Sequence, residues 1–301
     1  MSSANTALAS SAPPVSTSDT HNIPWPCLSV VSSATEQRLY SVLIRKGEWG
    51  SHTTLSAPRL EEIARAVEAE DITLVQARSL RRGLLRKRAM KREKDLRATS
   101  TRVLYDRGVS VPDLARDWDF PPVNTMRAIL KARQWDKAKV KAALQSPDTL
   151  LSTRDAREFR QAEAVDVVSK ADQTAKAEKA RLFEEVLRDH FSQLGVSYRV
   201  ESDLIQEQKA ASPDGTVTAT PDLLLLDPVT INGHPVHWVD AKCFYGADLP
   251  LPKKSAQKQA ARYTKHFGPG AIVYMRGFCD ALDVPGALLL DATPLDLSRM
   301  E

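Results

Sequence analysis

The chain has 301 residues, of which 42% are hydrophobic and 27% charged, enough for packed cores in about two domains. Its formal net charge of +4 hides an asymmetry, because residues 78–97 hold ten basic and two acidic side chains. That basic window therefore carries +8, and the rest of the chain carries −4. No apolar run approaches the roughly 18 residues that cross a bilayer, so we expect no membrane span.

The N-terminal composition and the cysteines indicate the compartment. Residues 1–33 are rich in small polar residues and proline, which predicts a disordered tail. Residues 1–19 have neither the apolar core of a secretory signal nor the arginines of a transit peptide. Three scattered cysteines, Cys27, Cys243 and Cys279, are too few for a disulfide framework or a zinc cluster. We expect reduced thiols and a protein of the nucleus or cytoplasm, neither secreted nor membrane-bound.

Residues 34–143 show the period of α-helices, as in Leu60, Ile63 and Val67. A helix expected at 73–97 contains the basic window, and it would bind a phosphate backbone without reading sequence. A solvated helix face or a nuclear-import signal is the alternative interpretation. The predicted nucleic-acid contacts in this helix are Arg81, Arg82, Arg86, Lys87, Arg88, Lys91 and Arg92.

Residues 101–133 predict three short helices. The first ends at Gly108, the second begins after Ser110, and the third begins near Val123. This is the layout of a helix-turn-helix, whose last helix can enter the major groove of DNA. Many three-helix modules never touch DNA, and that alternative stays open. The predicted nucleic-acid contacts in the third helix are Arg127 and Lys131.

A polar linker or weakly helical connector is expected at 144–173, followed by a compact α/β or α+β domain at 174–301. Asn232-Gly233 between two apolar runs predicts a hairpin, since both residues tolerate positive φ. The expected elements of this domain are a helix ending at Gly195, strands at 196–200, 223–227, 236–242 and 271–278, and a helix at 254–267.

Charged residues gather at the ends of the two middle strands. Asp222 opens one strand, while Asp240 and Lys242 share one face near the end of the next. Such groups are costly to hold in a half-buried setting, which favours a divalent-cation site. Asp222, Asp240 and the backbone carbonyl of Ala241 would suit Mg²⁺ or Mn²⁺. Lys242 would serve an attacking water. An ordinary ion pair at a sheet edge is the alternative.

Pro221-Asp222 followed by Asp240-x-Lys242 resembles the signature of the PD-(D/E)xK, or restriction-endonuclease-like, nuclease superfamily. The resemblance implies an α/β domain with a mixed central sheet and a catalytic set of Asp222, Asp240 and Lys242. It also implies a carboxylate on the helix before the first strand. Glu184, at the border of that helix's apolar stripe, is the candidate for a metal ligand or a metal-water contact. A solvated glutamate is the alternative.

Gln259 and Tyr263 share one face of the helix that follows Lys242, because they are four residues apart. They resemble the QxxxY element of the RecB-like and lambda-exonuclease-like branches, which implies that they shape the catalytic site.

Three segments, Thr220-Pro221-Asp222, "HPVHWVDAK" and "FGPGAIVYMRGF", resemble the TPD-motif family. The resemblance covers roughly residues 180–280, and that family also carries helix-turn-helix-like modules ahead of its nuclease domain. It implies a codanin-like protein partner.

Together these patterns predict a helical, helix-turn-helix-like region ahead of a restriction-endonuclease-like α/β domain. The predicted function is cleavage of phosphodiester bonds in DNA with a divalent metal, with structure-selective, resolvase-like cleavage as one specialisation. The alternative is a catalytically weak or inactive adaptor that binds DNA and a codanin-like chromatin partner. The oligomeric state stays open.

Overall fold

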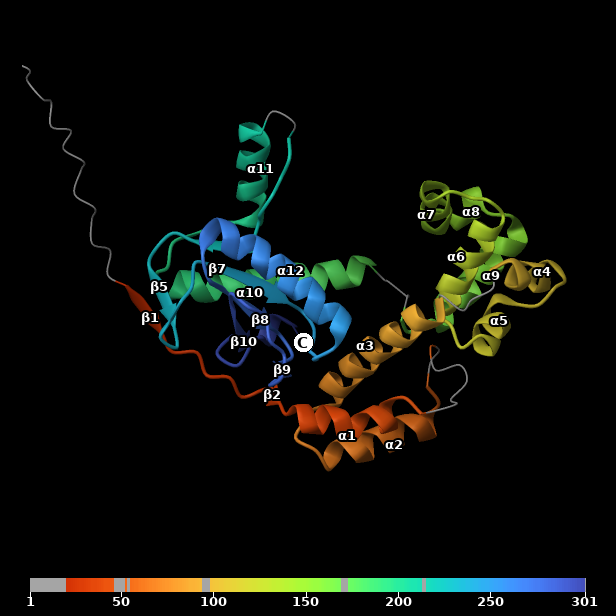
Figure 1. The fold of residues 1–301 in the computed structure, drawn as a ribbon, viewed down its shortest axis with the longest axis horizontal. Helices are drawn as coiled ribbons and strands as arrows, with labels where there is room; N and C mark the ends of the chain where they lie inside the picture. Colours follow the sequence, from red (N-terminus) through yellow and green to blue (C-terminus); the bar gives the residue numbers. More distant parts are fainter. Residues whose placement is uncertain are drawn as a thin grey trace, which may run out of the picture.

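A computed structural model shows a set of helices followed in the chain by a mixed α/β region, as predicted (Figure 1). The predicted tail at 1–19 lies outside the described residues. Within the described part of the chain, no helix is both long and apolar enough to span a membrane. The structure describes residues 20–45, 52, 55–93, 98–168, 173–212 and 215–300.

The central sheet has five strands in the order β10-β8-β7-β4-β3. Neighbours β10, β8 and β7 run parallel, whereas β7, β4 and β3 are antiparallel, so the predicted mixed sheet is observed. The four predicted strands are shorter than the apolar runs that indicated them, and the fifth strand, β10, was not predicted. Their bounds are Tyr198–Val200 (β3), Leu223–Leu225 (β4), Trp238–Lys242 (β7), Gly270–Tyr274 (β8) and Ala287–Asp291 (β10).

Helices α10 (Gln173–Gln193) and α12 (Pro250–Phe267) cover opposite faces of this sheet. Strand residues alternate between faces, so Val239 packs in the core with α10 while Trp238 packs in the core with α12. Asp240 therefore faces α12. This alternation decides which helix supplies partners to the charged residues of β7.

The Asn232-Gly233 turn is confirmed, with φ of 50° and 80° at the two residues. Its strands differ from the expectation, because the turn joins β5 (Val229–Ile231) to β6 (His234–Pro235). These two strands form a small separate sheet with β1 (His21–Ile23). The hairpin is thus an excursion between β4 and β7.

The segment from residue 20 to 33 is ordered, which corrects the prediction of a disordered tail there. β1 pairs in parallel with β5, and β2 (Val30–Val31) pairs with β9 (Phe278–Cys279). Trp25 is 2% exposed, and its indole Nε1 donates to the backbone oxygen of Asp291 at 2.8 Å. These partners lie more than 200 residues away, so local composition carried no sign of them.

We expect Trp25→Phe to lower the free energy of unfolding by about 2 kcal/mol, because a buried carbonyl loses its donor. Urea denaturation would measure the change. Leu28→Ala is the matched control in the same segment, since Leu28 is 80% exposed and should shift stability by less than about 0.5 kcal/mol. Equal effects of both changes would contradict anchoring by Trp25.

The first three helices pack with the α/β domain. The prediction that residues 34–143 form a separate helical region therefore does not hold for these helices. Leu39, Leu80 and other buried residues of these helices share one core with Trp238 and Tyr263. The bounds are Ser33–Leu43 (α1), Ala57–Glu68 (α2) and Leu74–Glu93 (α3). The basic window therefore lies on a helix that is docked to the sheet domain.

Helices α4 to α9 have a core of their own, built from residues such as Tyr105, Met126 and Phe159. Three of them lie where the pattern at 101–133 places them, and the middle one is capped by the Ser110 side chain. The predicted linker or weakly helical connector at 144–173 contains helices α8 and α9, and α9 is part of this core and not a connector. Figure 1 shows α3 running from the sheet toward this group. The bounds are Ala98–Asp106 (α4), Val111–Asp117 (α5), Pro122–Ala132 (α6), Lys137–Gln145 (α7), Pro147–Leu150 (α8) and Thr153–Val165 (α9).

Two further elements complete the α/β region. Helix α11 (Glu201–Ala211) leaves directly from the end of β3, and a short 3-10 helix (Ser298–Met300) contacts α10 near the end of the chain.

Candidate catalytic site

The antiparallel pairing of β4 and β7 brings the two predicted aspartates together. Leu223 is in register with Val239, so Asp222 lies just before the strand that borders Asp240. The Asp222 carboxylate accepts a hydrogen bond from the Ala241 amide at 2.6 Å. The N–H and C=O of one strand residue point to the same side, so the Ala241 carbonyl also points toward Asp222.

Asp240 is the most enclosed residue of the site, with 2% exposure. One of its carboxylate oxygens forms an ion pair with Lys242 Nζ. The other accepts from Gln259 Nε2 at 2.8 Å. Gln259 Oε1 in turn accepts from Lys242 Nζ at 2.9 Å. The three side chains form a closed ring that fixes the position of the lysine amine.

Helix α12 holds this ring in place through Tyr263. Gln259 Nε2 also donates to the Tyr263 hydroxyl at 3.0 Å, and that hydroxyl donates to the Thr220 backbone oxygen at 2.9 Å. The four-residue spacing places Gln259 and Tyr263 on the face of α12 that meets the sheet. The Tyr263 hydroxyl connects this helix to the segment that carries Asp222.

Glu184 lies half-buried on α10. Burial raises the pKa of its carboxyl, Arg188 acts against that shift, and the charges of Glu201 and Asp240 raise it further. The neighbouring Glu185 points elsewhere and forms an ion pair with Arg299 at 3.0 Å. The structure thus brings Glu184 within electrostatic reach of the aspartates.

Glu201 is a site neighbour that the sequence analysis missed. It begins α11 and accepts a hydrogen bond from the Thr220 hydroxyl at 3.3 Å. No motif spacing signals it, because its position depends on the turn from β3 into α11. It adds a further carboxylate beside the segment that carries Asp222.

Burial makes the ionised forms of Asp222 and Asp240 unfavourable, and Asp240 also repels Asp222. Burial and the charge of Asp240 raise the pKa of Asp222 to about 8. Burial also raises the pKa of Asp240, although Lys242 opposes the shift. A divalent cation would relieve this repulsion.

The oxygen ligands of this site would fit Mg²⁺ or Mn²⁺ only if waters completed the coordination. Among the described residues, no group of three or more His, Cys, Asp or Glu side chains is placed to hold a metal. Two carboxylates and the Ala241 carbonyl remain, and Mg²⁺ usually keeps several waters beside one or two carboxylates. The set therefore suits a hydrated hard cation and does not suit a zinc cage.

We expect Asp222→Asn to stabilise the metal-free protein at pH 8. The raised pKa of Asp222 contributes stability below about pH 4, and this stability is lost as pH rises to about 8. The melting temperature in chelator should therefore rise by about 2–4 °C for each kcal/mol of repulsion removed. The gain should vanish near pH 4, where the native Asp222 carboxyl is protonated.

Asp227→Asn is the control of opposite sign. The Ser197 amide lowers the pKa of Asp227, so its removal should lower the melting temperature at pH 8. A lower melting temperature for both variants would argue against repulsion at Asp222.

The structure separates the predicted nucleic-acid contacts into two groups. The prediction is wrong for Arg81, which is 6% exposed and donates to the Leu43 backbone oxygen at 3.1 Å. Arg88 is committed to an ion pair with the buried Asp119. A sequence pattern cannot distinguish them from their neighbours, because basic residues occur on all sides of this helix. The exposed members are Arg82, Arg86, Lys87, Lys91, Arg92, Arg127 and Lys131.

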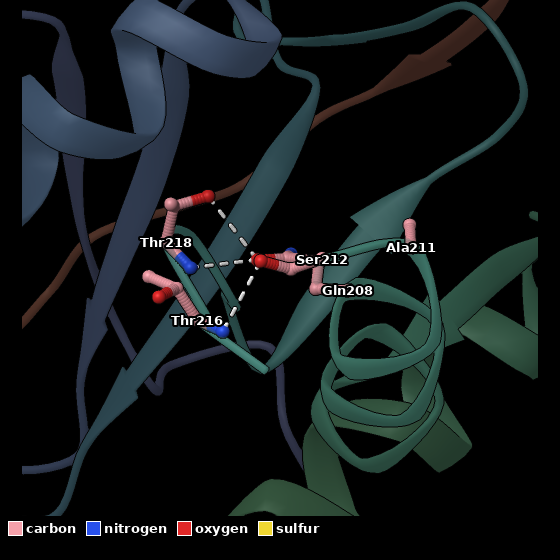
Figure 2. Close-up of a pocket in the computed structure, with 5 residues that line it drawn as sticks. All are labelled: Gln208, Ala211, Ser212, Thr216 and Thr218. Atoms are coloured by element: carbon pink, nitrogen blue, oxygen red, sulfur yellow. Dashed lines mark hydrogen bonds between the residues drawn. The ribbon is translucent and has the colours of Figure 1, made fainter. Parts of the chain in front are cut away.

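Figure 2 shows a shallow pocket between the end of α11 and the segment that leads to Asp222. Gln208 Oε1 accepts from the Thr218 amide at 2.8 Å, and Gln208 Nε2 donates to the Ala219 backbone oxygen at 2.6 Å. None of the predicted catalytic residues lines this pocket. Its contacts position the segment ahead of Asp222. The lining residues are Gln208, Ala211, Ser212, Thr216 and Thr218.

The geometry defines an α/β domain with a buried carboxylate–lysine–glutamine site at the end of one strand. A family described as "Protein of unknown function TPD sequence-motif" matches residues 151–293. The predicted resemblance to the TPD-motif family is therefore confirmed over that region. No solved structure matches the chain.

Several named proteins are similar to part of the chain. Uncharacterized protein L539 of Acanthamoeba polyphaga mimivirus is 33% identical over 121 residues, which is 39% of this chain and 42% of that protein. CDAN1-interacting nuclease 1 of Danio rerio is 32% identical over 120 residues, 39% of this chain and 37% of that protein. The Gallus gallus protein of the same name is 38% identical over 81 residues, 26% of this chain and 29% of that protein. The chain spans less than half the length of each of these relatives.

Proposed function

We propose that this chain is a divalent-metal-dependent nuclease of the PD-(D/E)xK type, acting on phosphodiester bonds in DNA in the nucleus or cytoplasm. The observation that carries the proposal is the ring of Asp240, Lys242 and Gln259 beside Asp222. An ordinary surface ion pair would need neither the burial of Asp240 nor a glutamine that contacts both partners. The relatives named nucleases support a nuclease-related function at the level of the family.

Asp222, Asp240 and the Ala241 carbonyl would hold Mg²⁺ or Mn²⁺, with Glu184 beside a metal-bound water. When bound, such an ion would polarise the phosphoryl group and lower the pKa of a water. The protein's part is to keep two carboxylates close together although burial raises their pKa values. The Ala241 amide keeps Asp222 oriented for this role.

Lys242 supplies a fixed positive charge at the end of β7. Asp240 and Gln259 hold its amine from two sides, so little rotamer freedom is left to lose when substrate binds. In that position the amine orients the attacking water and stabilises negative charge that develops on the phosphoryl oxygens. Tyr263 acts as a positioning residue through Gln259.

Nucleic acid would approach along α3. Arg82, Arg86, Lys87 and Lys91 are exposed on this helix, whose first turns pack in the same core as Trp238 of β7. Contacts of this kind bind phosphate without reading sequence. The helices from α4 to α6, with Arg127 and Lys131, would extend the contact. Structure-selective cleavage is a specialisation that the fold class allows.

The second candidate is an adaptor that binds DNA and a codanin-like partner with little or no catalysis. The printed names of the vertebrate relatives, which refer to an interaction with CDAN1, support a protein partner. The two candidates differ at Asp240, because an adaptor has no need of a buried carboxylate with a raised pKa.

A cleavage panel tests the proposal. Purified protein should cut at least one of single strands, duplex, flaps and four-way junctions with Mn²⁺ or Mg²⁺, and chelator should stop the reaction. Asp240→Asn should remove the activity, whereas Asp248→Asn changes an aspartate that pairs with Lys253 outside the site. Absence of cleavage across the panel with both metals would favour the adaptor.

A further inference from the structure

The carboxyl ends of β7 and β8 lie side by side just beyond the proposed catalytic residues. Lys242 is in register with Tyr274, and the Met275 amide donates to the Lys242 backbone oxygen at 2.8 Å. The following segments stay together, because the Gly246 amide donates to the Gly277 backbone oxygen at 2.9 Å. Side chains from these two segments therefore lie next to the lysine.

The first turns of α3 lie across the same two segments. Gln76 Nε2 donates to the Arg276 backbone oxygen at 2.9 Å. The Tyr245 amide donates to the Ser79 hydroxyl at 3.4 Å. Arg82, one turn further along the helix, is exposed. The basic helix thus meets the catalytic strand ends directly.

An aromatic side chain projects from this junction into solvent. Phe244 follows Lys242 by two residues and is 43% exposed. Its ring makes an edge contact with Tyr274, with centroids 5.9 Å apart and planes at 69°. Tyr274 is buried, and this burial, followed by the charge of Asp240, raises its pKa. The exposed ring therefore packs on a buried tyrosine that is in register with Lys242.

Two arginines, Arg276 and Arg82, lie on the segments that meet near Phe244. Arg276, on the segment after β8, is half-buried, and burial followed by the charge of Arg82 lowers its pKa. Within the described part of the chain, neither Arg276 nor Arg82 forms an ion pair with a carboxylate. Arginines on adjoining segments without a carboxylate partner suit a phosphate group.

We propose that Phe244 and Arg276 form a subsite for the nucleotide next to the scissile phosphate, with its base unpaired and stacked on the phenyl ring. Its phosphate would face Arg276 and Arg82. Bases inside a duplex are already stacked on each other, so the ring is useful only for a base that has left the stack. The preferred substrate class is therefore a strand end, a flap or an unpaired nucleotide. This inference rests on the proposed nuclease function.

Binding to the metal-free protein of 301 residues tests the subsite without any cleavage. Fluorescence anisotropy would compare a short thymidine oligonucleotide with an abasic oligonucleotide of the same length and charge. The native protein should bind the thymidine strand about 5- to 150-fold more tightly for each stacked base. Phe244→Ala should bring this ratio close to one, and Phe244→Trp should keep or increase it.

Two further variants separate stacking from charge. Arg276→Gln should weaken binding of both strands equally and lower the salt slope by about 0.7, as expected for one lost phosphate contact on a single strand. Leu194→Ala removes a side chain of similar exposure, 40%, beyond the end of α10 and should leave the ratio unchanged. Melting curves would check that each variant is folded.

The outcomes are distinct from those of the cleavage panel. Equal affinity of the native protein for the two strands, or a ratio unchanged in Phe244→Ala, would overturn the subsite. A failure to cut any substrate would overturn only the nuclease proposal, because the base preference would still locate a nucleic-acid contact at Phe244.

Discussion

Lys242→Ala should reduce the single-turnover rate of cleavage by about 10²- to 10³-fold, the range associated with loss of one group that stabilises developing negative charge. The amine is held at 2.9 Å from Gln259 Oε1 and by the Asp240 carboxylate. Alanine removes the charge that would face the attacking water and leaves Asp240 without its cation. The rate should be measured at saturating Mg²⁺ and enzyme, so that a change in DNA affinity does not enter.

Lys253→Ala is the matched control for this variant. Lys253 also lies at comparable burial and pairs with an aspartate, Asp248, at 2.9 Å, but that pair is outside the catalytic ring. Its removal should change the rate by less than about threefold, within the range of surface pairs. If Lys242 were only a structural partner of Asp240, both variants would lower the melting temperature and neither would slow cleavage greatly.

The candidate site could be predicted from sequence because its residues lie in short local patterns. Asp240 and Lys242 are two apart on a strand, and Gln259 and Tyr263 are four apart on a helix, so each spacing fixes a shared face. The closure of the ring could not be predicted. It depends on how far α12 sits above β7, which is set by the packing of Ala260 and Tyr263 against Trp238.

Other features could not be predicted because they depend on contacts distant in the chain. Trp25 is buried by partners near residues 190, 232 and 291. Arg81 meets the end of α1 and Arg88 meets Asp119. In a helix whose basic residues lie on several of its sides, charge alone does not reveal which side chains face protein. The docking of α1 to α3 on the sheet domain decides it.

The docking of α3 on the sheet domain leaves several of its basic residues exposed, and these should have a large effect on DNA binding. Replacing Arg82, Arg86, Lys87 and Lys91 together by glutamine should weaken duplex binding at 0.1 M salt by about 10²- to 10³-fold. Each lost phosphate contact should also lower the slope of log affinity against log salt by about 0.9. The four side chains are exposed, so the change removes charge with little effect on the core. Affinity measured across a salt series gives both quantities.

A charge-matched control decides whether position matters beyond net charge. Four exposed lysines on other helices can be neutralised instead, and these are Lys137, Lys141, Lys209 and Lys265. Both variants lose four positive charges, so a general field effect would weaken binding equally in each. A phosphate track on α3 predicts a large change in slope for the first variant and a small one for the second. Because α3 contacts the strand ends through Gln76 and Ser79, loss of the basic residues on α3 should also slow cleavage when the enzyme is subsaturating. At saturating enzyme the single-turnover rate should stay nearer to that of the native protein.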